Sequence, residues 1–306
     1  MSSPFGPMVL IANGRAGRGS VSKALPELTS ALDARDLAYE LRVTERAGHA
    51  TEIARDALAG GSRFLVAVGG DGTVQEVVNG MIAGDQAVAP DAVFGVVGAG
   101  TGCDFIRTFG IPGMPGHAAA HLDGGESFPI DIGKVTYQHA GTTKTRYFAN
   151  VAEVGIGAAT VDRANRLPGF LGPTIYFFAF WLTLRSHRSA DVKVDLVDRT
   201  YEGPMNNLVV ANGQFFGGGM KIAPKAAPTD GLLDIQIEHA RKREAIAIMP
   251  KIYKGEHVPH PDIEESKRVR VSIESASPLL VEADGEVLGH TPARFEVLKD
   301  ILNLKV

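Results

Sequence analysis

The chain has 306 residues, of which 44% are hydrophobic and 22% charged, and its formal net charge is −4. This length predicts two domains, and the composition is that of an ordinary globular protein. The negative charge, with no long basic run, argues against a nucleic-acid partner. The single cysteine, Cys103, excludes an internal disulfide and favours a reducing, cytoplasmic compartment; the N-terminus also lacks the pattern of a signal peptide.

Strands and helices alternate over the first 131 residues. This rhythm predicts an open parallel sheet with helices on both faces, in which ligands bind beyond the carboxyl ends of the strands. Glycine loops at 14–19, 69–72 and 98–102 all lie at that edge. The expected strands are Met8–Ala12, Tyr39–Val43, Phe64–Val68 and Phe94–Val97, and helices are expected around Leu25–Leu32, at Thr51–Leu58 and after Thr73.

The most informative segment is the turn Gly69-Gly70-Asp71-Gly72-Thr73, which follows a strand. Apolar residues recur at helical spacing from Val74, so a helix is predicted to begin in this turn. Free backbone amides and the positive end of that helix favour a phosphate group. Asp71 would repel a phosphate unless a cation lay between them. The turn therefore predicts a nucleotide phosphate with Mg²⁺, and it favours phosphoryl transfer over hydride transfer.

Two further glycine loops lie at the same edge. Asn13–Gly19 offers backbone for a phosphate and Arg15 or Arg18 as a countercharge, although a surface turn with solvated arginines is an equal alternative. Asp104 stands where a helix begins, so it either caps that helix or helps to hold a metal or a substrate hydroxyl. Cys103 is interpreted as a small buried residue rather than a nucleophile, because no base is evident nearby.

From Asp131 onward, short strands separated by turn residues suggest an antiparallel sandwich, with helices at residues 170–187 and about 242–253. The apolar stretch Phe170–Leu184 is shorter than the ~20 residues that cross a bilayer. A buried helix is the simpler interpretation, and a helix that lines an acyl-chain pocket or touches a membrane surface is the alternative. The expected strands are Ile132–Tyr137, Tyr147–Val151, Val192–Val197, Asn207–Ala211, Leu233–Ile237, Val269–Ile273 and Leu279–Glu282.

Turns in the second half supply further candidates. Asp230 either accepts its own turn amides or joins backbone carbonyls around a hard cation. Asp284 and Glu286 flank one glycine. A tight acidic turn is the simpler interpretation of that pair, and a general base for an attacking hydroxyl is the functional one. The glycines of Phe216–Met220 indicate a bulge or the close approach of a ligand.

Taken in order, these motifs resemble the soluble diacylglycerol kinase family of lipid kinases, which includes bacterial enzymes and the sphingosine kinases. The resemblance spans nearly the whole chain. Gly-Gly-Asp-Gly alone is shared with NAD kinases and phosphofructokinases, so the later motifs narrow the choice. The motifs that carry it are Asn13–Gly19, Gly69–Glu76, Gly98–Asp104, Asp131-Ile132-Gly133, Phe216–Pro224, Asp230-Gly231-Leu232-Leu233-Asp234 and Asp284-Gly285-Glu286.

The resemblance implies an α/β fold with two domains. Residues 1–131 would form a Rossmann-like open parallel sheet that binds ATP. Residues 132–291 would form a C-terminal antiparallel β-sandwich that binds lipid, with the site in the cleft between the two domains. The last strand, at 292–306, would return to the first domain.

The resemblance also implies ATP and Mg²⁺ as cofactors and a lipid hydroxyl as the acceptor, most simply that of diacylglycerol, which would give phosphatidic acid. Glu286 matches the general base, Asp71 would organise the Mg²⁺ waters, and Asp104 would support the same network. A separate structural Mg²⁺ would be bound by the carbonyls of Ala227 and Leu232 and the carboxylate of Asp230. The residues implied to contact the nucleotide are Asn13, Arg18, Thr44, Gly69, Gly70, Asp71, Gly72, Thr73, Glu76 and Thr101.

Two motifs depart from the family pattern. Asn13-Gly14 replaces Asn-Pro, and Gly98-Ala99-Gly100-Thr101-Gly102-Cys103-Asp104 replaces Pro-Leu-Gly-Thr-Gly-Asn-Asp, so a thiol stands in place of an amide. Three alternatives stay open: a kinase of phosphatidylglycerol or a sphingoid base, an NAD kinase-like enzyme, and a nucleotide-binding protein with impaired catalysis. We expect a cytoplasmic protein with transient contact to a membrane surface, and a homodimer is one possible assembly.

Overall fold

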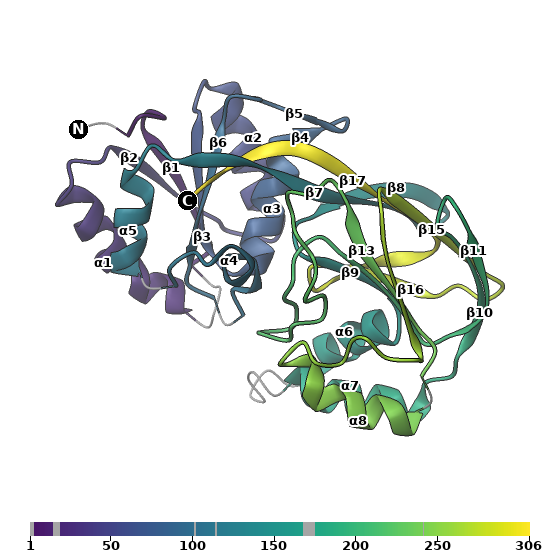
Figure 1. Cartoon of the computed structure of the whole chain (residues 1–306). Helices are drawn as coiled ribbons and strands as arrows, with labels where there is room; N and C mark the ends of the chain where they lie inside the picture. Colours follow the sequence, from purple (N-terminus) through teal and green to yellow (C-terminus); the bar gives the residue numbers. More distant parts are fainter. Residues whose placement is uncertain (1–2, 15–18, 101, 114, 168–174, 241) are drawn as a thin grey trace. The chain divides into compact units, whose positions relative to one another are not determined.

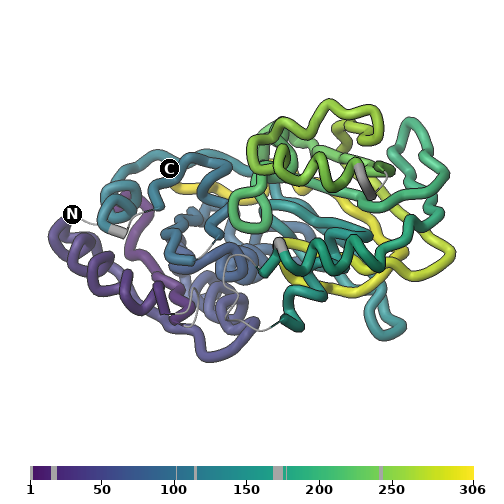
Figure 2. The backbone as a smooth tube through the Cα atoms, turned by 90° about the horizontal axis from the view of Figure 1, so that it is seen from below, coloured from purple at the N-terminus to yellow at the C-terminus, as the bar shows by residue number. Residues whose placement is uncertain are grey.

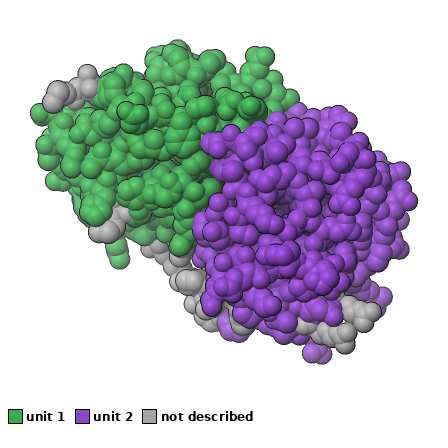
Figure 3. Space-filling model, in the orientation of Figure 1, with its two compact units in different colours: residues 1–132, 298–306 green, residues 133–297 purple. Residues whose placement is uncertain are grey.

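The structure is a computed structural model that describes residues 3–14, 19–100, 102–113, 115–167, 175–240 and 242–306. The chain divides into two compact units, drawn in different colours in Figure 3. Unit 1 comprises Met1–Ile132 together with Leu298–Val306, and unit 2 comprises Gly133–Val297. The boundary expected at 291/292 falls inside one continuous strand, β17 (Glu286–Lys305).

Unit 1 is built on a parallel sheet with the strand order β2-β1-β3-β6, and the end of β17 pairs with β6 through Asn303 and Leu304. Figure 2 shows this yellow C-terminal segment in the unit that also holds the N-terminus. Strands β1, β3 and β6 are buried along their whole length, as expected for parallel strands covered on both faces. The bounds are β1 (Met8–Ala12), β2 (Tyr39–Val43), β3 (Phe64–Gly69) and β6 (Val93–Gly98).

Helices cover both faces of this sheet (Figure 1), with α1 packed on α5 and α2 packed on α3. Gly80 of α3 allows the second pair to approach closely, because a Cβ there would lie 2.5 Å from the Thr51 carbonyl oxygen of α2. Pro26 lies inside α1 rather than in its first turn. The bounds are α1 (Ser20–Asp33), α2 (His49–Ala59), α3 (Asp71–Met81), α4 (Asp104–Phe109) and α5 (Pro115–Asp123), and a small hairpin joins β4 (Ile82–Ala83) to β5 (Gln86–Ala87).

Unit 2 is an antiparallel β-sandwich. Strand β17 pairs with β16, β15 and β7, so the sheet folds over a core that includes Phe148, Val210, Ile235 and Phe295. The strand bounds are β7 (Ser127–His139), β8 (Thr142–Phe148), β9 (Val151–Gly155), β10 (Ala190–Asp195), β11 (Thr200–Met205), β12 (Asn207–Ala211), β13 (Leu233–Glu238), β14 (Ile263–Arg268), β15 (Arg270–Ser275) and β16 (Leu280–Ala283).

Three helices accompany the sandwich: α6 (Ile156–Arg166), α7 (Ile175–Ser186) and α8 (Lys242–Ile252). The helix α6 was not expected from the sequence. The single strand expected at Tyr147–Val151 is wrong: β8 ends at Phe148, and β9 begins at Val151. The physical reason is that the backbone amides of Ala149, Asn150 and Val151 donate to the carboxylate of Asp284 at this break.

Candidate active site

The carboxyl ends of the unit 1 strands lie at one edge of the sheet, and the residues predicted to contact a nucleotide come directly after these strand ends. Ala12 of β1 is level with Val43 of β2 and Val68 of β3, and Gly69 of β3 is level with Gly98 of β6. Asn13, Thr44, Gly70 and Ala99 therefore begin four neighbouring loops on this edge. The structure brings these predicted loops together in the way that a ligand site in a parallel sheet requires.

Two of these loops touch through glycine backbone. The Ala99 amide donates to the Gly69 carbonyl at 2.9 Å. A Cβ on Gly100 would lie 2.5 Å from the Gly70 Cα and 2.9 Å from the Gly70 nitrogen, so only glycine allows this approach. Gly70 is the N-cap of α3 and supplies no side-chain hydrogen bond to the first helical amides. Helix amides without a side-chain partner are suited to an anion.

Asp71 and Asp104 lie at the starts of α3 and α4, and one hydrogen bond connects the two helix starts. The Phe105 amide donates to Asp71 Oδ1 at 2.9 Å. Asp104 is 4% exposed, and its Oδ1 lies 3.7 Å from Arg107 Nε. Both carboxylates, which were expected to serve a metal–phosphate network, are thus held close to the glycine loops.

Glu76 has a structural role in the described fold. Its Oε1 accepts the Gly48 amide at 2.9 Å and its Oε2 accepts the Ala50 amide at 3.0 Å, where α2 begins. The Thr51 hydroxyl donates to the Glu76 carbonyl at 2.8 Å. Both carboxylate oxygens therefore cap the N-terminus of α2. These hydrogen bonds connect α2 to α3, the helix that follows the glycine turn.

Cys103 occupies the N-cap of α4 in a left-handed conformation, with φ of 52°. Its thiol lies within 3.5 Å of the Gly100 carbonyl, and burial raises the pKa of the thiol. A thiol that stays protonated is a poor nucleophile, in agreement with the interpretation of Cys103 as a packing residue. An open pocket of about 440 Å³ adjoins it, lined by Gly98, Gly100, Gly102, Cys103, Ile106, Arg107, Gly110, Ile111 and Gly113.

Two predicted nucleotide contacts, Arg18 and Thr101, lie outside the described residues. Thr73 is 3% exposed, and its side chain fills the space beside Gly69. Gly72 is exposed in the first turn of α3.

In unit 2, the turn between β16 and β17 gives its two carboxylates different environments. Asp284 Oδ2 accepts the Ala149 amide at 2.7 Å, and its Oδ1 accepts the amides of Asn150 and Val151 at 2.9 and 3.1 Å. Glu286 points outward: its side chain is 51% exposed and its Oε2 accepts a hydrogen bond from Arg146 Nη2 at 2.6 Å. The carboxylate of Asp284 therefore stabilises the fold through backbone hydrogen bonds, whereas the carboxylate of Glu286 is accessible to a substrate.

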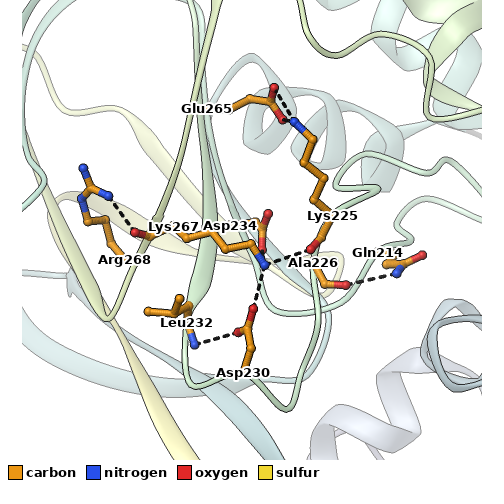
Figure 4. Close-up of polar contacts among 9 residues, drawn as sticks. All are labelled: Gln214, Lys225, Ala226, Asp230, Leu232, Asp234, Glu265, Lys267 and Arg268. Atoms are coloured by element: carbon orange, nitrogen blue, oxygen red, sulfur yellow. Dashed lines mark hydrogen bonds and ion pairs between the residues drawn. The ribbon is translucent and has the colours of Figure 1, made fainter.

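The turn expected to bind a structural Mg²⁺ is shown in Figure 4. Asp230 Oδ1 accepts the Leu232 amide at 3.0 Å, and the Ala227 carbonyl accepts the amides of Thr229 and Asp230. Among the described residues, no cluster of three His, Cys, Asp or Glu side chains suits a metal. The oxygen atoms at this turn are of the type that Mg²⁺ prefers.

A lysine from the neighbouring strand already supplies positive charge to this turn. The Lys267 ammonium donates to Asp230 Oδ2 at 2.7 Å and to the Lys225 carbonyl at 3.0 Å, and it lies 3.2 Å from Asp234 Oδ2 (Figure 4). Burial lowers the pKa of Lys267, but its bonds to the two aspartates raise it overall. A divalent cation at Asp230 would have to displace this ammonium, because Lys267 already pairs with the Asp230 carboxylate.

An apolar cavity of about 80 Å³ lies in unit 2. The glycine hairpin Phe216–Met220 forms part of its wall, with Gly217, Gly218 and Gly219 all at positive φ. Three consecutive left-handed residues explain why the sequence carries glycine here. The cavity is lined by Glu153, Ile156, Gly157, Thr160, Tyr176, Phe180, Asn207, Phe216, Met220, Ile222, Glu238, Met249, Ile252 and Tyr253.

Sequence reasoning did not find Arg146, Lys267 or Glu153. Arg146 and Lys267 carry no motif, and their carboxylate partners lie 140 and 37 residues away in the chain. Glu153 had one available signal, a charged residue inside an otherwise apolar run that precedes glycine.

Each half of the chain matches a known domain family. Residues 7–135 match the diacylglycerol kinase catalytic domain, and residues 150–306 match the YegS C-terminal NAD kinase beta sandwich-like domain. The diacylglycerol kinase of Bacillus subtilis (strain 168) is 30% identical over 94% of this chain and 91% of its own length. That of Staphylococcus carnosus (strain TM300) is 29% identical over 95% of this chain and 92% of its own length.

A crystal structure of a diacylglycerol kinase-like protein from Bacillus anthracis str. Sterne superposes with a TM-score of 0.79 at 25% identity, covering 98% of this chain and 94% of that one. The fold, the order of the motifs and the matches along nearly the whole chain all point to the same family. The chain belongs to the diacylglycerol kinase family.

Proposed function

We propose that this protein is an ATP-dependent lipid kinase that transfers the γ-phosphate to the free hydroxyl of diacylglycerol and forms phosphatidic acid. Its family supports a kinase reaction. The observation that carries the proposal is the contact between the glycine loops at Gly70 and Gly100, with Asp71 and Asp104 at the adjoining helix starts. Such an arrangement suits the phosphates of a nucleotide better than an uncharged ligand.

In this proposal, unit 1 binds ATP. The backbone at Gly70 and Gly100 accommodates the phosphates, with Asn13 and Thr44 on the neighbouring loops. When bound, Mg²⁺ neutralises charge on the phosphate oxygens. Asp71 and Asp104 would orient its water ligands, and the Phe105 amide fixes the Asp71 carboxylate for that task.

Unit 2 supplies the acceptor side. Glu286 takes the proton from the lipid hydroxyl while the hydroxyl oxygen bonds to the γ-phosphorus and the bond from that phosphorus to ADP breaks. Arg146 fixes the Glu286 carboxylate through the 2.6 Å hydrogen bond. The apolar cavity between α6, α7 and α8 is suited to part of an acyl chain.

We also propose peripheral contact with a membrane surface, from which the lipid would be drawn. Phe178 and Leu182 of α7 and Ile246 of α8 are each between 46% and 48% exposed. Exposed apolar side chains on neighbouring helices favour an apolar partner such as lipid. Within the described residues, no helix is long and apolar enough to cross a membrane.

A lipid-panel assay with labelled ATP tests the proposal. Mixed micelles would present diacylglycerol, phosphatidylglycerol or a sphingoid base, and NAD would serve as the soluble acceptor. We expect labelled phosphatidic acid from diacylglycerol, and a loss on the order of 10²–10³ in rate for Asp71→Asn. Labelled product from NAD alone, or ATP binding without any product, would overturn the lipid-kinase proposal.

A further inference from the structure

Two buried glutamates face each other beside the turn that carries Glu286. Glu153 of β9 and Glu282 of β16 are direct partners in the antiparallel register. Glu153 is 3% exposed and Glu282 is fully buried. Side chains at such paired positions have Cβ atoms about 4.5–5.5 Å apart, so the two carboxyl groups are neighbours.

The Glu153 and Glu282 carboxyl groups each accept a hydrogen bond at one oxygen. Glu153 Oε1 accepts the Asn207 side-chain amide at 2.8 Å, and Glu282 Oε2 accepts the Gly285 amide at 2.9 Å. The remaining oxygens, Glu153 Oε2 and Glu282 Oε1, are buried without a hydrogen-bond partner among the described residues. Two leftover carboxyl oxygens on opposed residues are satisfied together if one proton lies between them.

Within the described residues, no basic side chain forms an ion pair with Glu153 or Glu282, and Arg146 is bound to Glu286. The charged groups of α6 bond elsewhere: Arg166 pairs with Asp162, and Arg163 donates to Ser186. The other titratable groups on the packed elements are Glu238 of β13, Asp284 of the turn and Tyr176 of α7.

The surroundings favour retention of one proton. Burial raises the pKa of Glu153 to about 7, and burial together with the charge of Glu153 raises the pKa of Glu282 well above its usual value. The start of α6 and the Asn207 amide stabilise one negative charge, and the Glu153 carboxyl lies directly against Gly157 there. A second charge on the facing carboxyl would meet like-charge repulsion in a buried site.

We propose that Glu153 and Glu282 share a single proton and act as a positioning pair for the turn that carries Glu286. The link is Gly285, whose amide is bound by Glu282 and whose φ of 84° sets the turn between Asp284 and Glu286. Loss of the shared proton places two charges side by side, pushes Glu282 away and releases the Gly285 amide. The inference rests on the proposed role of Glu286 as the general base.

The decisive variant is Glu282→Gln. Its side-chain oxygen accepts the Gly285 amide, and its NH₂ group donates permanently to Glu153, so it mimics the protonated pair. We expect wild-type kcat to fall as the pH rises through about 7, where the pair loses its proton, while the KM for ATP changes little. Glu282→Gln retains the kcat of the low-pH form and loses the alkaline fall. Glu282→Leu, which cannot bind Gly285, has a low kcat at every pH.

Asp131→Asn is the matched control, because Asp131 is also a fully buried carboxylate that accepts a backbone amide, from Asp300, but in unit 1. This control keeps the alkaline fall. A Glu282→Gln profile that falls as in the wild type would overturn the proposal.

A second readout does not depend on turnover. Burial raises the pKa of Glu238 to about 8, so its carboxyl is also protonated at pH 6 and serves as an internal reference. Carbon-13 NMR of labelled glutamate carboxyls is expected to show, besides Glu238, one buried protonated carboxyl at pH 6 that loses its proton near pH 7 and is absent from Glu153→Gln and Glu282→Gln. Both carboxyls ionised at pH 6 would refute the shared proton. If no lipid is phosphorylated while this signal is present, the pair stands and the lipid-kinase proposal fails, so the two failures are distinguishable.

Discussion

The acidic turn of unit 1 and that of unit 2 place their carboxylates in opposite ways. Asp71 lies in a turn made of glycine and accepts the Phe105 amide, and the N-cap Gly70 has no side chain that could cap the first amides of α3. In the turn of unit 2, three backbone amides bind Asp284, and Arg146 donates to the exposed Glu286. In unit 1 the amides at the start of α3 are suited to bind an anion. In unit 2 the backbone amides bind Asp284, and Glu286 remains exposed.

The different environments of Asp284 and Glu286 suggest a structural role for the first carboxylate and a chemical role for the second. Three backbone amides occupy the carboxylate oxygens of Asp284, so its role is to hold the chain at this break. The side chain of Glu286 is half exposed, so a substrate hydroxyl could reach its carboxylate.

Gly100→Ala should damage the nucleotide side most. The new Cβ would lie 2.5 Å from the Gly70 Cα, so one glycine loop must move. A displacement of about 1 Å at a reacting group can cost on the order of 10² in rate, and we expect kcat/KM to fall by at least that factor. Gly72→Ala is the control for stability, since a Cβ there meets open space; its melting temperature should not fall. Normal ATP binding by Gly100→Ala would contradict the role given to this contact.

Asp284→Ala should destabilise unit 2. It removes the acceptor of three backbone amides at the break between β8 and β9. Hydrogen bonds to a charged group contribute about 1.5–3 kcal/mol each and are not additive, so we expect a loss of about 3 kcal/mol. Calorimetry should show a melting temperature lower by roughly 5–10 °C. Glu286→Ala, at an exposed position, is the comparison and should melt near the wild type; equal losses would remove the distinction between the two carboxylates.

Lys267→Met tests which cation neutralises the turn at Asp230. It leaves Asp230 and Asp234 without their shared ammonium. Because Lys267 is partly exposed, we expect a loss of about 1–2 kcal/mol in unfolding free energy. Added Mg²⁺ should recover part of this loss in the variant and leave the wild type unchanged. Lys225→Met, which breaks an exposed pair with Glu265, is the control. Stabilisation of the wild type by Mg²⁺ would instead favour a metal that displaces Lys267.

Cys103→Asn should have the smallest effect. Cys103 has φ of 52°, a conformation that asparagine adopts more readily than most residues. We therefore expect a gain of a few tenths of a kcal/mol in stability, seen as a slightly higher melting temperature. Cys103→Val, which disfavours the left-handed conformation, is the opposing control and should melt lower. A large loss of stability in Cys103→Asn would show that the thiol makes a contact that the amide cannot replace.

The parallel sheet of unit 1 was predictable because β1, β3 and β6 are short apolar runs, and β3 and β6 end in glycine. Met8–Ala12 and Tyr39–Val43 were predicted with the bounds that the structure has. The break after Phe148 was not predictable, because it depends on Asp284, more than 130 residues further along the chain. Helix α6 was missed because its buried face consists mostly of small residues, Ala158, Thr160 and Ala164, which give a weak hydrophobic signal in the sequence.

The motifs predict where candidate site residues stand in the chain, but not what those residues contact. Glu76 was predicted to contact the nucleotide, and in the structure both of its carboxylate oxygens cap α2. The residues alone left open which of Asp284 and Glu286 is the base, and only the family resemblance favoured Glu286. The partners of these residues could not be predicted because they are distant in the chain: Arg146 for Glu286, Lys267 for Asp230 and Glu153 for Glu282.

The most direct measurement is single-turnover transfer of labelled γ-phosphate to diacylglycerol by Glu286→Gln, with ATP affinity and melting temperature measured on the same sample. We predict a transfer rate lower by about 10²–10⁴, with ATP affinity and stability unchanged, because only the proton acceptor is lost. Transfer at the wild-type rate by Glu286→Gln would contradict the assignment of Glu286 as the base.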